Sequence, residues 1–393
     1  MNILFVLKSI NGGGIQVVTS VLANKFVVEG HNVCVFAFFR GEGNTILLYD
    51  KRVKILNGNC FECNTENIEL LHNFIQENHI EIVINQYGLP LTPINTIIKS
   101  TKDLDVKIIS FYHNDPLQNG RIQTIDNQLL STSSFFKKNI LKLKRLFFRC
   151  VTGYAMRYVY NHSDLYCVLS PSFIENFKKF TWKKHTEKLV VQTNPITIDN
   201  RDYVYNLNEK MNEILYVGRL DKTQKCVHRI IEAWAKIEKE YPDWCLKIVG
   251  YGEDLERLNI LTEKLKLSHV YFEGMQKPRP YYEKAQILLL TSDFEGFGLV
   301  IIEGMSFGVV PIVYGSYSAV FDIIDNEHDG LITSSPYNIE NTVSCLQKII
   351  NDTQLRQQMA LEAIKKSEKF SLDRICCQWN NLFDKVKKAS NYN

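Results

Sequence analysis

Two kinds of hydrophobic pattern alternate along this chain of 393 residues. Short continuous apolar runs, such as Ile3–Leu7 and Leu246–Val249, predict strands that are covered on both faces of a sheet. Longer stretches with an apolar residue at every third or fourth position, such as Ile15–Glu29, predict helices. Because strand and helix patterns alternate from end to end, we expect an α/β protein built on parallel sheets.

The pattern also divides the chain. The polar stretch 197–212 has no hydrophobic periodicity and predicts a linker. We therefore expect two Rossmann-like, doubly wound domains, at 1–196 and at 213–370. A last amphipathic helix, within 371–393, carries Trp379 and Phe383 on one side. We expect it to cross back onto the first domain.

Composition places the chain among globular, water-soluble proteins, with 45% hydrophobic and 23% charged residues. Its ten cysteines are dispersed, and the lone pair Cys60 and Cys63 lacks the second pair that a zinc site needs. The N-terminus shows no secretory pattern, and no apolar run is long enough to span a membrane. These features favour a reducing cytoplasm.

The stretch Leu288–Tyr314 holds the clearest candidate chemistry: a buried strand, a glycine-containing loop, a short helix and a second strand. A helix that begins near Gly298 offers unpaired N–H groups and a positive dipole end to a phosphate. Glu303 then lies about 8 Å along the helix axis, the reach from a diphosphate to a ribose. Glu295 precedes the glycine. Two solvated glutamates on an ordinary strand-loop-helix are the alternative interpretation.

Candidate groups also follow other predicted strands, at the edge where parallel sheets bind ligands. Arg219 and Lys225 follow the strand Glu213–Val217 and suit a leaving diphosphate. Gly13 and Gly14 follow the first strand in a glycine-rich turn that lets the backbone approach a sugar or phosphate. His113 follows the strand Val106–Tyr112 and could donate to a sugar hydroxyl. A tight turn and a structural loop histidine remain the alternatives.

Residues 133–160 form an unusual basic stretch. Seven Lys and Arg residues lie between Lys137 and Arg157, interleaved with Phe and Leu, and no acidic residue occurs between Asp126 and Asp164. A basic amphipathic helix of this kind can lie on an anionic membrane surface. A long helix with a solvated lysine face is the alternative. No motif supports nucleic-acid binding.

Together these motifs resemble the retaining glycosyltransferases of family 4, which have the GT-B fold. The most specific element is E-x7-E, here Glu295 to Glu303, followed by Gly304 and by Gly308-x-x-Pro311. The sequence Val217–Leu220 with Lys225, and the glycine turn with Gly30, are the others. The resemblance is strong from about Glu213 to Phe383 and looser over the first domain.

The resemblance implies two domains that enclose a nucleotide-sugar donor in a cleft. Glu303 would bind the ribose, and Arg219 with Lys225 would neutralise the leaving diphosphate. Glu295 and His113 would contact the donor sugar. The remaining implied donor contacts are backbone groups at Phe297, Gly298, Leu299, Gly13 and Gly14. One departure is Cys226, which stands where the family usually has glycine after the lysine.

The expected activity is retaining transfer of a hexose or N-acetylhexosamine from a UDP-sugar, with GDP as second choice, to a saccharide acceptor. A lipid-linked acceptor and an anionic membrane surface are the expected further partners. We expect no metal and no cofactor, and we interpret Asp103-Leu104-Asp105 as a solvated turn. The alternatives are a GT-B sugar-nucleotide epimerase and a non-catalytic nucleotide-sugar-binding protein. The missing G-x-G-x-x-G spacing disfavours a nicotinamide oxidoreductase.

Overall fold

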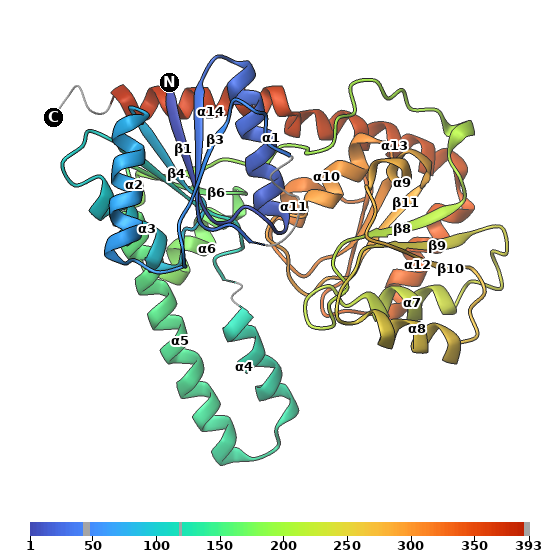
Figure 1. Cartoon of the computed structure of the whole chain (residues 1–393). Coiled ribbons are helices and arrows are strands. Elements are labelled where there is room, and N and C mark those ends of the chain that lie inside the picture. Colours follow the sequence, from blue (N-terminus) through green and yellow to red (C-terminus); the bar gives the residue numbers. More distant parts are fainter. Residues whose placement is uncertain (42–47, 118–119, 389–393) are drawn as a thin grey trace. The chain divides into compact units, whose positions relative to one another are not determined.

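The computed structural model describes residues 1–41, 48–117 and 120–388. The chain folds into two units (Figure 1). The N-terminal unit contains Met1–Pro195 together with the C-terminal stretch from Leu372, and the C-terminal unit contains Ile196–Ser371.

The N-terminal unit is built on a parallel sheet in the order β3-β2-β1-β4-β5-β6-β7. Its strands are β1 (Asn2–Ser9), β2 (Asn32–Phe39), β3 (Lys54–Asn57), β4 (Ile82–Asn85), β5 (Lys107–Tyr112), β6 (Leu165–Val168) and β7 (Leu189–Val191). Its helices are α1 (Gly14–Val28), α2 (Thr65–Glu77), α3 (Leu91–Ser100), α4 (Gly120–Ser131), α5 (Phe135–Asn161), α6 (Ser172–Thr181) and α14 (Leu372–Lys388). The strand order reverses between β1 and β4, which makes this crevice the topological switch point of the sheet.

The C-terminal unit has a second parallel sheet in the order β10-β9-β8-β11-β12-β13, and it reverses between β8 and β11. Its strands are β8 (Glu213–Val217), β9 (Cys245–Val249), β10 (Val270–Gly274), β11 (Ile287–Leu290), β12 (Val310–Tyr314) and β13 (Leu331–Thr333). Its helices are α7 (Val227–Ala235), α8 (Leu255–Lys264), α9 (Arg279–Lys284), α10 (Leu299–Ser306), α11 (Val320–Ile323), α12 (Ile339–Asn351) and α13 (Thr353–Ser367), with 3-10 turns η2 (Leu207–Glu209) and η3 (Glu368–Phe370). The expectation of two Rossmann-like α/β sheets is confirmed.

Central strands carry the core of each unit. The side chains of Ile3–Leu7 in β1 and of Ile287–Leu290 in β11 are almost completely buried. A parallel sheet needs this continuous apolar sequence because helices cover both of its faces. Two of the four edge strands, β3 and β13, are short and fall outside the strands that the hydrophobic pattern predicts.

The last helix packs on the N-terminal unit. In α14, Trp379 stacks on Phe111 at 5.5 Å between ring centroids and meets Phe26 edge-on at 6.1 Å. Phe383 adds a second edge-on contact with Phe26 at 5.5 Å. The aromatic side of this helix therefore crosses back as expected; residues 389–393 of the predicted range lie outside the described residues.

The stretch 197–212, predicted as a linker, groups with the C-terminal unit. Lys210 lies buried there and donates to the carbonyl oxygens of Tyr282, at 2.8 Å, and Phe307, at 2.7 Å. Both carbonyls belong to helix C-termini, where the negative dipole end favours a cation. Burial nevertheless lowers the pKa of Lys210 to about 7. The segment is thus anchored to α9 and α10.

Within the described part of the chain, no helix combines the length and apolarity that a membrane span needs. The longest described helix, α5, pairs with α4 to form a hairpin that projects from the body of the N-terminal unit (Figure 1). The ion pair of Arg145 with Asp126, at 2.6 Å, joins the two helices.

Candidate active site

The loop after β11 begins the site. Gly298 is the N-cap of α10, and its φ of 89° and ψ of 50° lie in the left-handed region. A Cβ at this position would lie 2.8 Å from the Ile301 Cδ1 atom and 2.9 Å from the Tyr317 hydroxyl oxygen. Only glycine fits there. The helix begins at Leu299, as expected, so its first N–H groups lie just beyond the carboxyl end of β11. Phe297 is buried and packs edge-on against Phe370.

The loop after β8 turns around Asp221. Its carboxylate accepts hydrogen bonds from the backbone N–H groups of Thr223, at 2.8 Å, and Gln224, at 2.7 Å. Gln224 in turn accepts a hydrogen bond from Arg219, at 2.9 Å. The guanidinium also lies 3.5 Å from Asp221, and the Arg219 side chain is largely exposed. The turn therefore presents Arg219 toward solvent and carries the chain on to Lys225.

Lys225 and Glu295 meet. The ammonium nitrogen lies 2.6 Å from Glu295 Oε1, and only 17% of the lysine and 8% of the glutamate side chain are exposed. One residue follows β8 and the other follows β11, so the ion pair lies at the carboxyl side of the switch point of this sheet. Ligands of open parallel sheets bind at such crevices. The structure thus brings two predicted site residues together across 70 positions of sequence.

Cys226 keeps the loop in an unusual conformation. Its φ of 50° and ψ of 43° are left-handed, the region that glycine enters most readily. The side chain is buried, with Sγ 3.4 Å from the Lys222 carbonyl oxygen and 3.5 Å from Asp293 Oδ2. The non-glycine residue therefore adopts the backbone geometry that a glycine would supply, and its thiol packs under the loop.

Asp293 is a structural partner that the sequence interpretation missed. Its Oδ1 atom lies 2.5 Å from Arg229 of α7. The Arg229 guanidinium lies 4.6 Å from the ring centroid of Tyr337 and 5.6 Å from that of Tyr314. The ion pair holds the loop after β11 against α7, and the cation–π contacts join α7 to β12 and to the segment before α12. In the sequence, Arg229 is one of many cations on a predicted helix, and nothing marks its partner.

Glu303 is buried on α10. Thr197 donates to Oε1 at 2.5 Å, and the Tyr282 hydroxyl donates to Oε2 at 3.2 Å. Burial raises the pKa of the Glu303 carboxyl, and the two hydrogen bonds oppose that rise. Each oxygen keeps a lone pair for another donor. The sequence placed Glu303 on the helix but identified neither Thr197 nor Tyr282 as its neighbours.

In the N-terminal unit, the glycine turn connects β1 to α1. Gly12 has a φ of 146°, and a Cβ there would lie 2.9 Å from the Gln16 amide nitrogen. Gly13 is the N-cap of α1, and a Cβ there would meet no atom within 4 Å. Gly14 is the first residue of the helix. Backbone conformation therefore explains glycine at position 12 but not at position 13.

His113 follows β5 and pairs with a residue that the sequence did not single out. Its Nε2 atom lies 2.6 Å from Gln86 Oε1, and its ring stacks on Phe111 at 4.9 Å. A carbonyl oxygen only accepts, so Nε2 carries the proton and Nδ1 is an acceptor. Burial lowers the pKa of His113 to about 3, which keeps the ring neutral. In this arrangement Nδ1 of His113 is an unprotonated acceptor, while its Nε2–H is already used by Gln86.

The D-x-D sequence and the other acidic side chains show no arrangement suited to a metal ion in the described residues. Asp105 of the D-x-D sequence is largely exposed and lies 3.2 Å from Lys107. Across residues 1–41, 48–117 and 120–388, no group of three or more His, Cys, Asp or Glu side chains is placed to hold a metal ion.

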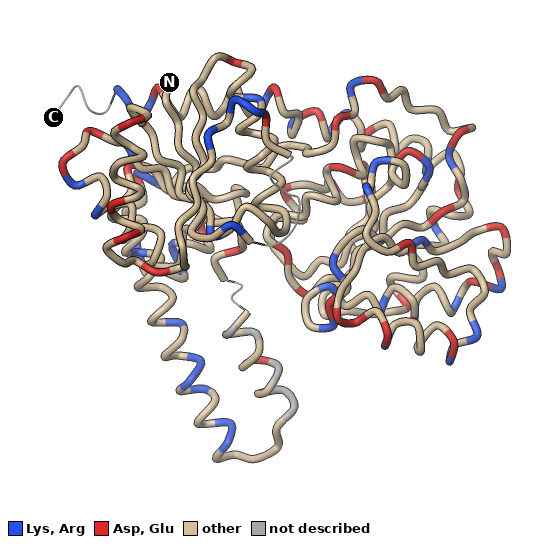
Figure 2. The backbone as a smooth tube through the Cα atoms, viewed as in Figure 1, with Lys and Arg blue, Asp and Glu red and all other residues tan. Residues whose placement is uncertain are grey.

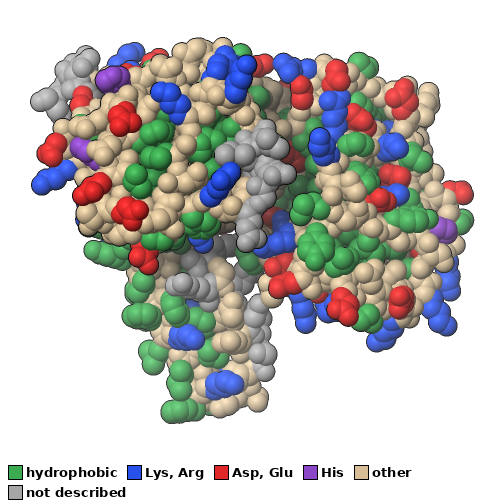
Figure 3. Space-filling view, viewed as in Figure 1, with side chains coloured by type: hydrophobic (Ala, Val, Ile, Leu, Met, Phe, Trp, Pro, Cys, Tyr) green, Lys and Arg blue, Asp and Glu red, His purple; other side chains and the backbone are tan. Residues whose placement is uncertain are grey.

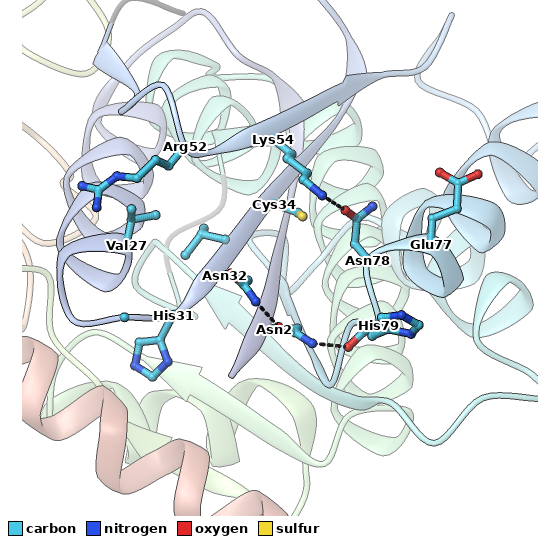
Figure 4. A pocket seen from close by; sticks show the side chains of 12 residues that line it. Asn2, Val27, His31, Asn32, Cys34, Arg52, Lys54, Glu77, Asn78 and His79 are labelled. Atoms are coloured by element: carbon cyan, nitrogen blue, oxygen red, sulfur yellow. Dashed lines mark hydrogen bonds between the residues drawn. The ribbon is translucent and has the colours of Figure 1, made fainter.

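A pocket of about 450 Å³ lies at the opposite edge of the N-terminal sheet (Figure 4). Asn2 and Asn32, the first residues of β1 and β2, lie in its wall. Their side chains hydrogen-bond to each other at 2.8 Å, and Asn2 also donates to the His79 carbonyl oxygen. Lys54 donates to Asn78 at 2.7 Å. None of the predicted site residues lines this pocket.

Several known proteins that are similar to this chain are glycosyltransferases. Residues 198–366 match the family model described as glycosyl transferases group 1. An uncharacterized glycosyltransferase of Haemophilus influenzae is 30% identical over 209 residues, which are 52% of this chain and 58% of that protein.

Two further proteins match over nearly the whole chain. One is the Campylobacter jejuni GalNAc-alpha-(1->4)-GalNAc-alpha-(1->3)-diNAcBac-PP-undecaprenol alpha-1,4-N-acetyl-D-galactosaminyltransferase, 24% identical over 99% of this chain and 100% of that protein. The other is the structure of Anabaena HepE in complex with UDP-glucose, with a TM-score of 0.75 at 16% identity, covering 98% of this chain and 100% of that chain. Residues 198–366 of the C-terminal unit are thus similar to group 1 glycosyl transferases, and the whole chain has the fold of GT-B glycosyltransferases.

Proposed function

We propose that this protein is a retaining, metal-independent glycosyltransferase. It moves a hexose or N-acetylhexosamine from a nucleoside-diphosphate sugar, UDP rather than GDP, to a saccharide acceptor in cell-surface polysaccharide biosynthesis. The observation that carries the proposal is the meeting of Lys225 and Glu295 at the switch point between β8 and β11, beside the N-terminus of α10.

In this proposal the C-terminal unit binds the donor. The diphosphate lies against the N–H groups at the start of α10, from Phe297 to Leu299, with Arg219 and Lys225 as counter-charges. The ribose hydroxyls donate to Glu303, which Thr197 and Tyr282 hold in place. Glu295, fixed by its ion pair, accepts from hydroxyls of the donor sugar.

The N-terminal unit contributes Gly13, Gly14 and His113. Because folding does not require glycine at position 13, we assign its lack of a side chain to close approach of the donor diphosphate or acceptor. Neutral His113 accepts a hydrogen bond from the donor sugar through Nδ1.

The proposed chemistry replaces the anomeric C–O bond to the diphosphate with one to the acceptor oxygen on the same face of the sugar. The acceptor proton passes to an oxygen of the leaving phosphate. The protein supplies positioning, and Arg219 and Lys225 stabilise the charge that develops on the diphosphate. No protein nucleophile and no metal ion take part.

The relatives support the finer parts of the proposal. The Campylobacter relative is named for an alpha-linked product and an undecaprenol-linked acceptor. An alpha product formed from an alpha-linked UDP-sugar means retention. The Anabaena structure holds UDP-glucose. We extend these properties to this chain as a UDP-sugar donor and a lipid-linked saccharide acceptor.

Calorimetric titration of the purified full chain with UDP and with GDP tests nucleotide binding. We expect UDP to bind more tightly than GDP, with unchanged affinity in EDTA. Tighter binding of GDP would mean that the donor is a GDP-sugar rather than a UDP-sugar. Lack of binding to either nucleotide would overturn the proposed function.

A further inference from the structure

Helix α5 exposes a continuous row of large apolar side chains. Its members are between 48% and 76% exposed, and they are Phe136, Ile140, Leu143, Phe147, Val151 and Tyr154. Figure 3 shows hydrophobic side chains along the projecting hairpin. We call these six residues the α5 stripe. Scattered exposed apolar residues are ordinary on a protein surface, but a contiguous set on one element marks an interaction site.

The spacing of the stripe defines a single face of the helix. Successive members are separated by four, three, four, four and three residues, which keeps them on one side of an α-helix. From Phe136 to Tyr154 the stripe spans about 27 Å. Arg145, paired with Asp126 of α4, lies on the opposite side of α5. The partner helix of the hairpin therefore leaves the stripe uncovered.

The charge on this helix has one sign. From Phe135 to Asn161, α5 carries seven Lys and Arg residues and no Asp or Glu. Figure 2 shows basic positions along its whole projecting length. Arg145 contacts α4 and Arg149 contacts α6, but Lys137, Lys138, Lys142 and Lys144 form no ion pair within the described part of the chain. Lys137 and Lys144 lie at the border of the stripe.

We propose that the α5 stripe is a docking surface for an anionic lipid bilayer. The helix lies parallel to the membrane plane, with the stripe among the acyl chains and the lysine ammonium groups at the lipid phosphates. A second copy of the chain fits this surface less well than a bilayer does. Pairing two α5 helices through their stripes would bring Lys137 and Lys144 beside like charges, and the helix has no acidic residue to offset them.

This surface would keep the enzyme where a lipid-linked acceptor is presented. The docking proposal does not rest on the proposed function, because vesicle binding needs neither donor nor acceptor. Failure of one therefore leaves the other standing.

The first experiment measures flotation of the purified full chain with vesicles of phosphatidylcholine alone, or with 30 mol% phosphatidylglycerol. We expect binding to the anionic vesicles and little to the neutral ones. The variant F136S/L143S/F147S removes half of the stripe, and we expect its affinity to fall by about 1,000-fold or more, since each of the three buried side chains contributes at least about tenfold. The matched control V204S/M275S/F321S removes three exposed apolar residues from the C-terminal unit and should bind like wild type.

The second experiment separates charge from apolar burial. Each lysine near an anionic surface contributes about fivefold in affinity, so K137Q/K142Q/K144Q should weaken binding by about 100-fold. The control K239Q/K264Q/K277Q changes three exposed lysines of the C-terminal unit and should have little effect. Raising the salt concentration to 0.5 M should weaken the binding of wild type, because the Debye length falls to a few ångströms.

Circular dichroism melting establishes that each variant is folded before its binding is compared. The proposal is overturned if folded wild type does not float with anionic vesicles, or if the stripe variant floats as well as its control. A concentration-dependent dimer in sedimentation analysis that the stripe substitutions dissociate would assign the surface to a second copy instead.

Discussion

Replacing Glu303 by Gln should separate ligand binding from folding. The carboxylate is buried, and burial raises its pKa above the usual 4.5. A carboxyl with a raised pKa holds its proton in the folded chain at pH values where the unfolded chain has lost it. Its ionisation therefore reduces folding stability as pH rises through that window. An amide has no such cost, so we expect Glu303→Gln to be at least as stable as wild type at pH 7.

The same substitution should weaken nucleotide binding. Ribose hydroxyls would donate to the two carboxylate oxygens, beside the bonds from Thr197 and Tyr282. The amide keeps one acceptor oxygen and loses one charge-assisted hydrogen bond, worth about 1.5–3 kcal/mol. The affinity for UDP should therefore fall about 10- to 150-fold. Because ribose is bound equally in the ground and transition states, the KM for the donor should rise with little change in kcat.

Glu213 provides a matched control. It is also buried with a raised pKa, but it is the first residue of β8, at the opposite edge of the sheet. Glu213→Gln should leave UDP affinity unchanged. Calorimetric titration with UDP and urea unfolding of both variants supply the measurements. Unchanged UDP affinity in a less stable Glu303→Gln would show that Glu303 serves the fold, and would refute its role as ribose ligand.

Three further outcomes follow from the structure, and a fourth follows from the proposed mechanism. Lys225→Ala should lower kcat by about 10²–10³, as for one oxyanion-hole donor, whereas exposed Lys222→Ala in the same loop should not; equal rates for both would remove Lys225 from the mechanism. Gln86→Glu should raise the His113 pKa, because a carboxylate favours the imidazolium, and nitrogen NMR should show the Nε2–H tautomer in wild type; an Nδ1–H signal would contradict the pairing. Cys226→Val should lower stability by about 2 kcal/mol or more in urea unfolding, since a β-branched residue resists the left-handed conformation, while Cys226→Gly should change it by less than about 1 kcal/mol. Dialysis against EDTA should leave transfer activity unchanged, and restoration of a lost activity by Mg²⁺ or Mn²⁺ would overturn the metal-independent mechanism.

The sequence predicts the architecture well because continuous apolar strands are a strong local signal. The bounds expected for β8 match the structure, and those expected for β1 and β9 differ by one or two residues at an end. The edge strands β3 and β13 were missed, because neither contains an apolar run of four residues and β3 carries no fully buried side chain. Residues 197–212 lack a periodic pattern because individual contacts such as that of Lys210, rather than a repeated apolar face, hold them to the C-terminal unit.

The sequence predicts the site residues that belong to motifs. It does not predict those that are recognisable only from their tertiary contacts. The sequence identified Lys225 and Glu295, but their ion pair depends on the adjacency of β8 and β11, which are separated by two other strands in the chain. The partners of His113 and Glu303 are an ordinary glutamine, threonine and tyrosine whose positions follow only from the folded sheets. At Cys226 the sequence shows a departure from the family pattern, but only the structure shows that the backbone there is left-handed.

The most direct test of retaining transfer is proton NMR of the full chain with a panel of UDP- and GDP-sugars in the absence of acceptor. We predict slow consumption of a UDP-sugar, with release of UDP and with the alpha anomer of the free sugar appearing before mutarotation. Appearance of the beta anomer first would contradict retention, and formation of an epimer would identify an epimerase. No consumption of any sugar nucleotide, in a protein that is folded, would contradict the central claim.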